Sequence, residues 1–505
     1  MPGIKRKLVR NTIANAIMKF WGYIIGFLMF PFIVGYVGVE DYGLYLLVGA
    51  FVGYFGLLDF GVSGALVKYV AEYNAKNEKE TINKVINSTF VFYTIIGVVI
   101  CAFVLLLGTY YVDFFKIESG DLWKARLIAY LMAIGALTSW PMRSFSTSLD
   151  GLQRYDLSAI INFITVNINA IVTVTLLLRG FGIVEIIFSG IVIGALSQII
   201  IVLIMKKLLP YVELKKSYIE FSTLKKVFTF SSVLFISQLI GILMFGFDRL
   251  LLGIFVSVAA ITYYAVARKL FDIVATVTYI PQSALLPAAT ELEALNKKES
   301  STKLLIKTSK YYSAVCLSTT VLIFFLAEPI ILFWMGSEFI GMAIMTQVFI
   351  SYGFFTSFGG VANSFLLVKE KYKVILLILL IISIANLILS IILVQYIGIM
   401  GVVLGTTIPN IVTAPILIPY MLKQLDIDIK RYLKSIVPQT YIPALIMSVS
   451  IYLIMNFITI SSIVILGSVA IISLLIYYLI FYFIGLDKEE KNDLFRLITF
   501  KKNVV

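Results

Sequence analysis

The chain has 505 residues, of which 60% are hydrophobic and only 14% are charged, and its mean hydropathy is +0.99. Soluble domains carry about a quarter of charged residues, so this composition excludes a soluble globular protein and indicates an integral membrane protein. The net charge of +13 would suggest nucleic-acid binding in a soluble domain. The chain has no His and only two Cys, in distant apolar runs, so we expect no metal, no disulfide framework and no cofactor.

Apolar runs long enough to cross a bilayer, about 20 residues each, follow one another along the whole chain. The predicted class is therefore an all-α polytopic membrane protein. The basic N-terminal segment resembles a signal peptide, but its apolar run continues without a small-residue cleavage site and is interpreted as a retained first helix. We predict about fourteen spans, at 11–36, 43–70, 88–112, 125–149, 156–178, 183–205, 227–255, 259–288, 305–333, 340–368, 373–396, 399–422, 435–459 and 461–486.

Basic residues alternate between the connectors in the way that the positive-inside rule describes. With the N-terminus in the cytoplasm, most of the 41 Lys and Arg residues fall on the cytoplasmic side, including the six lysines of the connector 206–226. We therefore expect a multi-pass protein of the cytoplasmic membrane with both termini in the cytoplasm. The basic charge then needs no nucleic-acid partner, and attraction to anionic lipid headgroups follows from it.

Two short sequence matches suggest a duplicated unit of six helices. GFLMFPF at Gly26–Phe32 matches GILMFGF at Gly241–Phe247, and the polar AEYNAKNEKE at Ala71–Glu80 matches TELEALNKKE at Thr290–Glu299. Units with an even number of helices are related by an axis along the membrane normal, as in some transporters. The predicted organisation is an N-terminal bundle (1–205), a cytoplasmic linker (206–226), a C-terminal bundle (227–423), two further helices (424–486) and a cytoplasmic tail (487–505).

Eight charged residues lie at least six residues from either end of a predicted span, where each costs roughly 2.5 to 3.5 kcal/mol at a helix centre and so faces protein or water. Their five basic and three acidic groups favour an anionic group on the substrate. They are the candidate substrate-binding residues: Lys19, Asp59, Arg143, Asp248, Arg249, Arg268, Lys269 and Asp272.

Structural roles for these charges stay open at this point. Asp248 and Arg249 can lie near a helix end, and Arg268 and Asp272, at i and i+4, can satisfy one another. Lys19 and Asp59 share a depth and could pair; Arg143 can face a cavity or reach the headgroups.

Three stretches carry a resemblance to a known family. They are Pro31–Tyr73, the GLQRYD connector at Gly151–Asp156, and Phe247–Asp272. The chain resembles the polysaccharide-exporter and O-antigen-flippase family, which belongs to the superfamily of the multidrug and toxin extruders and the lipid II flippase. The resemblance implies two six-helix bundles forming a V around a central cavity, with alternating access, and two added C-terminal helices.

The same resemblance implies a function. The expected activity is translocation of a polyprenyl-diphosphate-linked oligosaccharide across the cytoplasmic membrane for polysaccharide biosynthesis. Membrane lipids, a polysaccharide polymerase and glycosyltransferases are expected partners. In this family basic cavity residues are thought to meet the diphosphate or acidic sugars, and the matching candidates are Lys19, Arg143, Arg249, Arg268 and Lys269.

Two alternatives remain. An ion-coupled extruder of cationic drugs would require acidic groups to dominate the cavity; the first helix lacks the acidic residue that many such extruders use, although Asp248 keeps this alternative open. A membrane-embedded glycan polymerase or ligase is less favoured because the outer connectors are short. No phosphate-binding GxxxxGK[ST] loop occurs, so no nucleotide-driven motor is expected.

Overall fold

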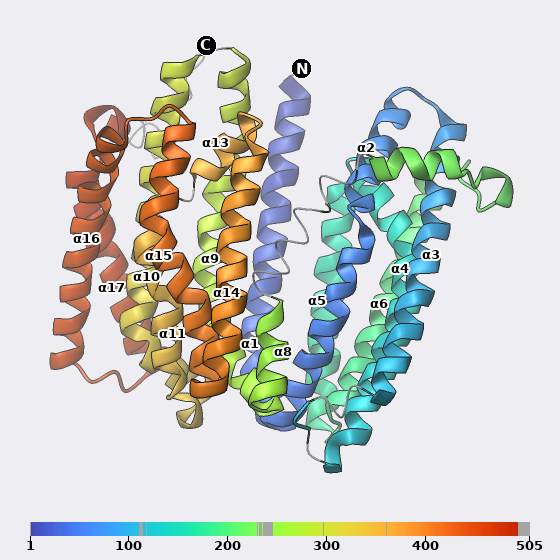
Figure 1. Ribbon diagram of the computed structural model, residues 1–505, viewed down its shortest axis with the longest axis horizontal. Helices are drawn as coiled ribbons and strands as arrows, with labels where there is room; N and C mark the ends of the chain where they lie inside the picture. Colours follow the sequence, from blue (N-terminus) through green and yellow to red (C-terminus); the bar gives the residue numbers. More distant parts are fainter. Residues whose placement is uncertain are drawn as a thin grey trace. The chain divides into compact units, whose positions relative to one another are not determined.

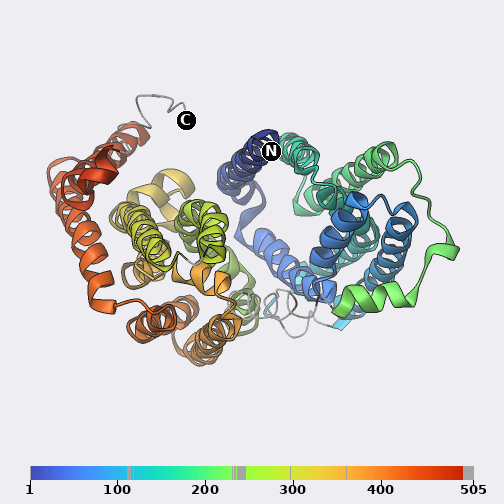
Figure 2. The same cartoon turned by 90° about the horizontal axis from the view of Figure 1, so that it is seen from above.

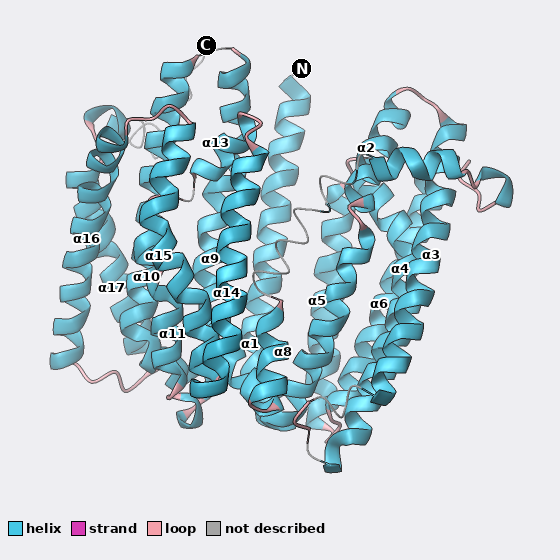
Figure 3. Cartoon of the chain, in the orientation of Figure 1, coloured by secondary structure: helices cyan, strands magenta, loops and turns pink. Residues whose placement is uncertain are grey.

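The computed structural model describes residues 2–110, 115–117, 119–229, 231, 235, 246–295, 297–359 and 361–492, and within these ranges helices account for all regular structure (Figure 3). Contacts divide the chain into two compact units, Met1–Thr262 and Tyr263–Val505. The division falls within helix α9, so the predicted boundary between two bundles at 226/227 lies inside the first unit. Figure 2 looks along most of the helices, and each unit is seen there as a bundle viewed end-on.

The first unit is built from long helices that pack both against neighbours in sequence and against helices further along the chain (Figure 1). Its helices are α1 (Pro2–Tyr54), the 3₁₀ helix η1 (Phe55–Asp59), α2 (Val62–Ala75), α3 (Lys79–Tyr110), η3 (Ser119–Asp121), α4 (Leu122–Gly151), α5 (Tyr155–Leu178), α6 (Ile183–Leu208), η4 (Lys216–Tyr218) and α8 (Phe247–Phe255). Helix α4 packs against α2, α3 and α6.

The second unit begins within α9 (Val258–Ala294). The remaining helices are α10 (Lys298–Met335), η5 (Ser337–Phe339), α11 (Met342–Ser351), α12 (Gly353–Thr356), α13 (Ala362–Val368), α14 (Tyr372–Ile397), α15 (Ile399–Gln424), α16 (Ile429–Phe457), α17 (Ile463–Ile480) and the π-helix η6 (Phe481–Gly485). Helices α16 and α17 lie at one edge of the unit, where α10 packs against both (Figures 1 and 2).

Nine helices of the described part are long and apolar enough to cross a membrane: Phe20–Asp59, Lys79–Leu106, Tyr155–Leu178, Ile183–Leu208, Lys298–Met335, Lys373–Ile397, Ile399–Gln424, Ile429–Phe457 and Ile463–Gly485. Runs rich in Ile and Val form helices because a helix pairs its own backbone groups in lipid. The all-α polytopic membrane class is therefore confirmed, and the count of fourteen spans stays a prediction. The expected spans at 88–112, 227–255 and 340–368 include residues outside the described part.

Two predicted spans are not continuous helices. The span expected at 43–70 stops at Tyr54, continues as η1 and restarts as α2, because Phe60 and Gly61 adopt left-handed conformations with φ of 50° and 76°. A helix cannot pass through two such residues. The span expected at 340–368 is divided into α11, α12 and α13.

The first predicted connector, in contrast, coincides with an observed kink. Gly38 has φ of 85° and joins two helical segments of α1 at the place where the sequence separates the spans 11–36 and 43–70. A positive φ is accessible to Gly without a Cβ clash, which explains why the kink falls there. The charged segment after it, Glu40–Asp41, therefore lies within the second helical segment of α1.

The polar repeat occupies equivalent local structures in the two units. Ala71–Glu80 covers the end of α2, a turn and the start of α3, and Thr290–Glu299 does the same between α9 and α10. Glu78 N donates to Tyr73 O at 2.9 Å, and Lys297 N, at the matching position, donates to Leu292 O at 3.0 Å. This helix-ending hydrogen bond supports the inference of duplication at the level of local structure.

Candidate functional site

The break between η1 and α2 places a carboxylate in the interior of the first unit. Asp59 is the last residue of η1 and is fully buried. The left-handed residues that follow turn the chain so that Ser63, in the first turn of α2, faces back toward Asp59. Its backbone N lies 3.4 Å from Asp59 Oδ2, and its hydroxyl donates to Asp59 Oδ1 at 2.6 Å.

Helices α3 and α4 complete the surroundings of this carboxylate. The Tyr93 hydroxyl donates to Asp59 Oδ1 at 2.6 Å, and Arg143 Nε lies 3.6 Å from the same oxygen. Arg143 Nε also donates to Ser63 Oγ at 3.2 Å. A buried carboxylate is tolerated where it is paired and hydrogen-bonded, and Asp59 meets both conditions. Asp59 thus holds one edge of the Arg143 guanidinium in place.

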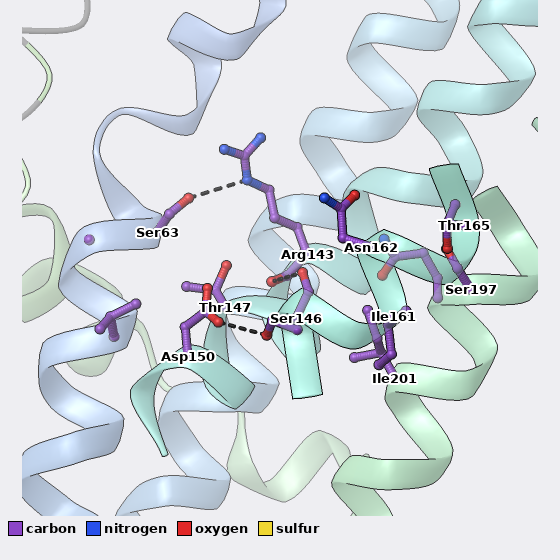
Figure 4. A pocket seen from close by; sticks show the side chains of 14 residues that line it. Ser63, Arg143, Ser146, Thr147, Asp150, Ile161, Asn162, Thr165, Ser197 and Ile201 are labelled. Atoms are coloured by element: carbon purple, nitrogen blue, oxygen red, sulfur yellow. Dashed lines mark hydrogen bonds between the residues drawn. The ribbon is translucent and has the colours of Figure 1, made fainter. Parts of the chain in front are cut away.

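Arg143 reaches from this interior network into a pocket. Its side chain is 39% exposed, and the guanidinium carbon lies 5.2 Å from the centre of the Trp140 ring, so the ring supports the cation from α4 itself. Figure 4 shows the two terminal nitrogens of Arg143 extending beyond the contact with Ser63. Arg143 therefore lines this pocket of the first unit, and its contact with a substrate stays a prediction.

The pocket has a volume of about 560 Å³ and lies among α2, α4, α5 and α6. Besides Arg143, its lining consists mainly of hydroxyl, amide and carboxyl side chains: Ser63, Ser146, Thr147, Asp150, Ser158, Asn162, Thr165, Ser197 and Gln198. Asp150 accepts a hydrogen bond from Ser158 Oγ at 2.7 Å, and the buried Oε1 atom of Gln198 has no partner. The lining thus offers one cation, one carboxylate and many neutral hydrogen-bonding groups.

Helical spacing explains how one face of each helix supplies these groups. Arg143, Ser146, Thr147 and Asp150 follow the i, i+3, i+4, i+7 pattern of a single face of α4. On α5, the residues Ser158, Asn162 and Thr165 do the same. Arg143 and Asp59 were predicted from the sequence, whereas Ser63, Tyr93 and the remaining polar residues of α4 were not. The polar face of α4 was the signal that could have identified the latter.

The other predicted site residues of the first unit do not line this pocket, or their side chains lie outside the described residues. Lys19 belongs to α1, but its side chain lies outside the described residues, so its predicted pairing with Asp59 stays untested. Asp248 is buried and Arg249 partly buried in the first turn of α8, the helix-end position considered above. Arg249 lies within electrostatic range of the hydroxyls of Tyr42 and Tyr45 in α1.

The second unit carries the remaining three candidates on α9. Arg268 Nε lies 2.9 Å from Asp272 Oδ1, so these two residues form the i, i+4 ion pair that was the structural alternative. The guanidinium carbon of Arg268 also lies 5.1 Å from the centre of the Phe271 ring. Contact of Arg268, Lys269 or Asp272 with a substrate stays a prediction.

No group of three or more His, Cys, Asp and Glu residues within the described residues could hold a metal ion.

Comparisons with known proteins identify relatives of this fold. The family described as polysaccharide biosynthesis protein matches residues 8–293. A solved structure titled lipid II flippase MurJ, in an inward closed conformation, has a TM-score of 0.74 and 18% identity, with 96% of this chain and 100% of that chain covered. No curated protein sequence matches the chain.

Transporters of one superfamily share the fold at lower similarity. An inward-facing multidrug resistance MATE family transporter of the MOP superfamily has a TM-score of 0.62 and 16% identity, with 81% of this chain and 98% of that chain covered. A MOP superfamily transporter from Pyrococcus furiosus, whose title reports a binding pocket of reversed polarity, has a TM-score of 0.58 and 15% identity, with coverage of 83% and 95%. At these identities the similarity establishes the fold.

Proposed function

This chain belongs to the family of polysaccharide biosynthesis proteins, and on that premise we propose that it is a flippase for a polyprenyl-diphosphate-linked oligosaccharide. The observation that carries the proposal is the polar pocket around Arg143 inside a bundle of apolar helices. A membrane-embedded cation with a hydroxyl-rich and amide-rich surrounding suits a cargo that carries both phosphate and sugar. The transporter fold of the solved relatives supports the same proposal.

The geometry of Arg143 suits the binding of an anion. Its Nε edge is occupied by Ser63 and Asp59, so the guanidinium is oriented before any ligand arrives. The terminal nitrogens extend past this contact (Figure 4). A planar guanidinium with two terminal nitrogens can bind two oxygens of one phosphate or carboxylate, which a Lys cannot do in the same way. We therefore assign Arg143 the phosphate or acidic-sugar contact and the Ser, Thr, Asn and Gln residues the neutral sugar contacts.

An extruder of cationic compounds is less well supported. Asp59 has no exposed surface and already accepts hydrogen bonds from Ser63 and Tyr93. The second carboxylate near Arg143 is Asp150, which accepts from Ser158. A cationic substrate would thus meet the positive charge of Arg143, whereas the carboxylates of Asp59 and Asp150 already accept hydrogen bonds from the protein.

We place the protein in the cytoplasmic membrane with both termini in the cytoplasm, working without catalysis of its own. Glycosyltransferases that build the lipid-linked glycan and a polymerase that consumes it are the proposed partners. Movement of the cargo needs a conformational change driven by an ion gradient, the membrane potential or removal of product.

Transbilayer movement of a fluorescent polyprenyl-diphosphate oligosaccharide in proteoliposomes tests the proposal. Arg143→Gln should slow protein-dependent movement by roughly tenfold or more, because a charge-assisted hydrogen bond contributes about 1.5 to 3 kcal/mol. Arg179→Gln is the matched control, because it removes the same charge from an exposed residue at the end of α5. Wild-type protein that moves no such lipid under several ion gradients, or equal rates for the two variants, would contradict the proposal.

A further inference from the structure

A second cavity lies within the second unit, at the ends of three elements. It has a volume of about 740 Å³ and is formed where the first turns of α10 and α16 meet the end of η6 and the segment after it. Its volume falls in the range of roughly 300 to 1,000 Å³ typical of small-molecule sites. The polar lining residues are Ser300, Lys303, Lys307, Lys310, Arg431, Ser435, Gln439, Asp487, Glu489 and Glu490.

A buried ion pair fixes the wall that follows η6. Lys310 Nζ of α10 donates to Glu490 Oε2 at 2.5 Å and to Gly485 O at 2.7 Å, and the side chains of Lys310 and Glu490 are only 9% and 4% exposed. Asp487 and Glu490 also cap each other: Asp487 N donates to Glu490 Oε2 at 2.9 Å, and Glu490 N donates to Asp487 Oδ1 at 2.8 Å. These hydrogen bonds and the ion pair therefore fix the segment after η6 as one wall of the cavity.

The other basic and acidic residues of the cavity come from different elements. The walls from α10 and α16 contribute Lys303, Lys307 and Arg431, whereas the segment after η6 contributes Asp487 and Glu489. Lys303 Nζ lies 2.8 Å from Glu299 Oε1, but both side chains are more than half exposed, and such pairs contribute little. A ligand that fits this arrangement carries a negative group and a positive group a short distance apart.

The cavity also has an apolar lining. Leu292, Leu304, Ile306, Ile484 and Leu486 line the cavity, and Ile484 is 48% exposed. Ile484 lies at the end of the apolar span Ile463–Gly485, whose outer face includes the exposed Leu479 and Phe483. The cavity thus lies at the level where an apolar helix surface ends and charged residues begin, which is the position of lipid headgroups.

We propose that this cavity binds the headgroup of a zwitterionic glycerophospholipid that carries a primary ammonium group. Arg431 and Lys303 bind the phosphodiester, Asp487 and Glu489 accept hydrogen bonds from the ammonium, and the acyl chains follow the exposed face of α17 and η6. This lipid is distinct from the transported cargo, so the inference goes beyond the proposed function. A purely anionic headgroup fits less well, because it would face two carboxylates without a compensating positive group.

Native mass spectrometry of the purified full-length protein tests the proposal, with phosphatidylethanolamine and phosphatidylglycerol added separately in equal amounts. We expect selective retention of phosphatidylethanolamine. Arg431→Gln should lower this retention about tenfold, the change expected for one lost charge-assisted hydrogen bond. Arg431→Lys should retain part of it. Lys434→Gln, on the same helix but outside the cavity lining, is the matched control and should leave retention unchanged.

The acidic wall provides the decisive comparison. Glu489→Gln should weaken retention of phosphatidylethanolamine and strengthen retention of phosphatidylglycerol, because the change removes an acceptor for one lipid and a repulsive charge for the other. Equal retention of both lipids by the wild type, or no response to either Arg431→Gln or Glu489→Gln, would overturn the proposal. Displacement of the lipid by millimolar inorganic phosphate alone would also overturn it, since that result describes a simple anion site.

Discussion

Arg143 Nε of α4 lies 3.6 Å from Asp59 Oδ1 of η1, and the Ser63 hydroxyl hydrogen-bonds with both side chains. The Asp59 carboxylate is fully buried, while the Arg143 side chain is 39% exposed and lines the pocket. The pair therefore has an interior half, the Asp59 carboxylate, and a pocket half, the Arg143 guanidinium. The interior half orients the cation, and the pocket half is left to act on a ligand.

Asp59→Asn tests the interior half. The change keeps the shape of the side chain but removes its negative charge, which strengthens the hydrogen bond from Tyr93 and pairs with Arg143. We therefore expect the free energy of unfolding to fall by about 1.5 to 3 kcal/mol. Flipping should fall as well, because Arg143 loses its orientation. Thermal unfolding in detergent and the proteoliposome assay measure the two effects. Glu40→Gln, at an exposed position of α1, is the control; equal stability of both variants would contradict the assigned role of Asp59.

Gly61→Ala tests the break before α2. Gly61 has φ of 76°, a conformation that costs a residue with a Cβ roughly 1 to 2 kcal/mol. The variant should therefore be less stable by about that amount and should bind ligand less well, because Ser63 is positioned by the same turn. Gly49→Ala is the matched control: its Cβ would meet nothing within 4 Å, and it lies within helix α1, so it should be neutral or slightly stabilising.

Asn87→Ala tests how the connector after α6 is held against α3. Asn87 Nδ2 donates to Glu213 O at 2.8 Å, and Lys215 N donates to Asn87 Oδ1 at 2.9 Å. Losing both bonds should expose the connector, so trypsin should cut after Lys215 and Lys216 several times faster. Thr81→Ala, which removes only an exposed contact with Glu78, should leave the cleavage rate near that of the wild type. Equal rates for both variants would show that the asparagine does not hold the connector.

The same connector should respond to acid through Glu220. A hydrogen bond from Lys84 holds the pKa of Glu220 below its ordinary value of 4.5. A depressed pKa in the folded state gives stabilisation that is present above the ordinary pKa and is lost as the pH falls through the lowered one. Hydrogen exchange should therefore show stronger connector protection in the wild type than in Glu220→Gln at neutral pH. The difference should vanish in strong acid, and a difference independent of pH would contradict this assignment.

Lys310→Met tests the buried ion pair that forms the wall of the lipid cavity. Removing one partner of a buried pair leaves the other charge uncompensated and costs about 3 to 5 kcal/mol. Much of that loss should be recovered in the double variant Lys310→Met, Glu490→Gln, because no unpaired buried charge remains. Unfolding in detergent measures both. A double variant that is less stable than Lys310→Met would show that the charge pairing is not what stabilises this wall.

The sequence by itself determined the class of the protein, because hydropathy and helix-length requirements in a bilayer are local properties of the chain. It also identified the family through stretches such as Pro31–Tyr73, and it identified Asp59 and Arg143 as charges inside apolar runs. Helix-ending turns were predictable where polar residues mark them, as at Ala71–Glu80.

Only the tertiary structure decided which of these residues meet. Arg143 reaches Asp59 because α4 packs against α2 and because the chain turns at Phe60 and Gly61. Neither the packing nor the turn can be predicted from hydropathy averaged along a helix. The broken span at 43–70 was not predicted for the same reason: a left-handed Phe is imposed by its surroundings and not by its residue type. Likewise, the cavity at Arg431 joins three segments far apart in sequence, and their common position depends on packing alone.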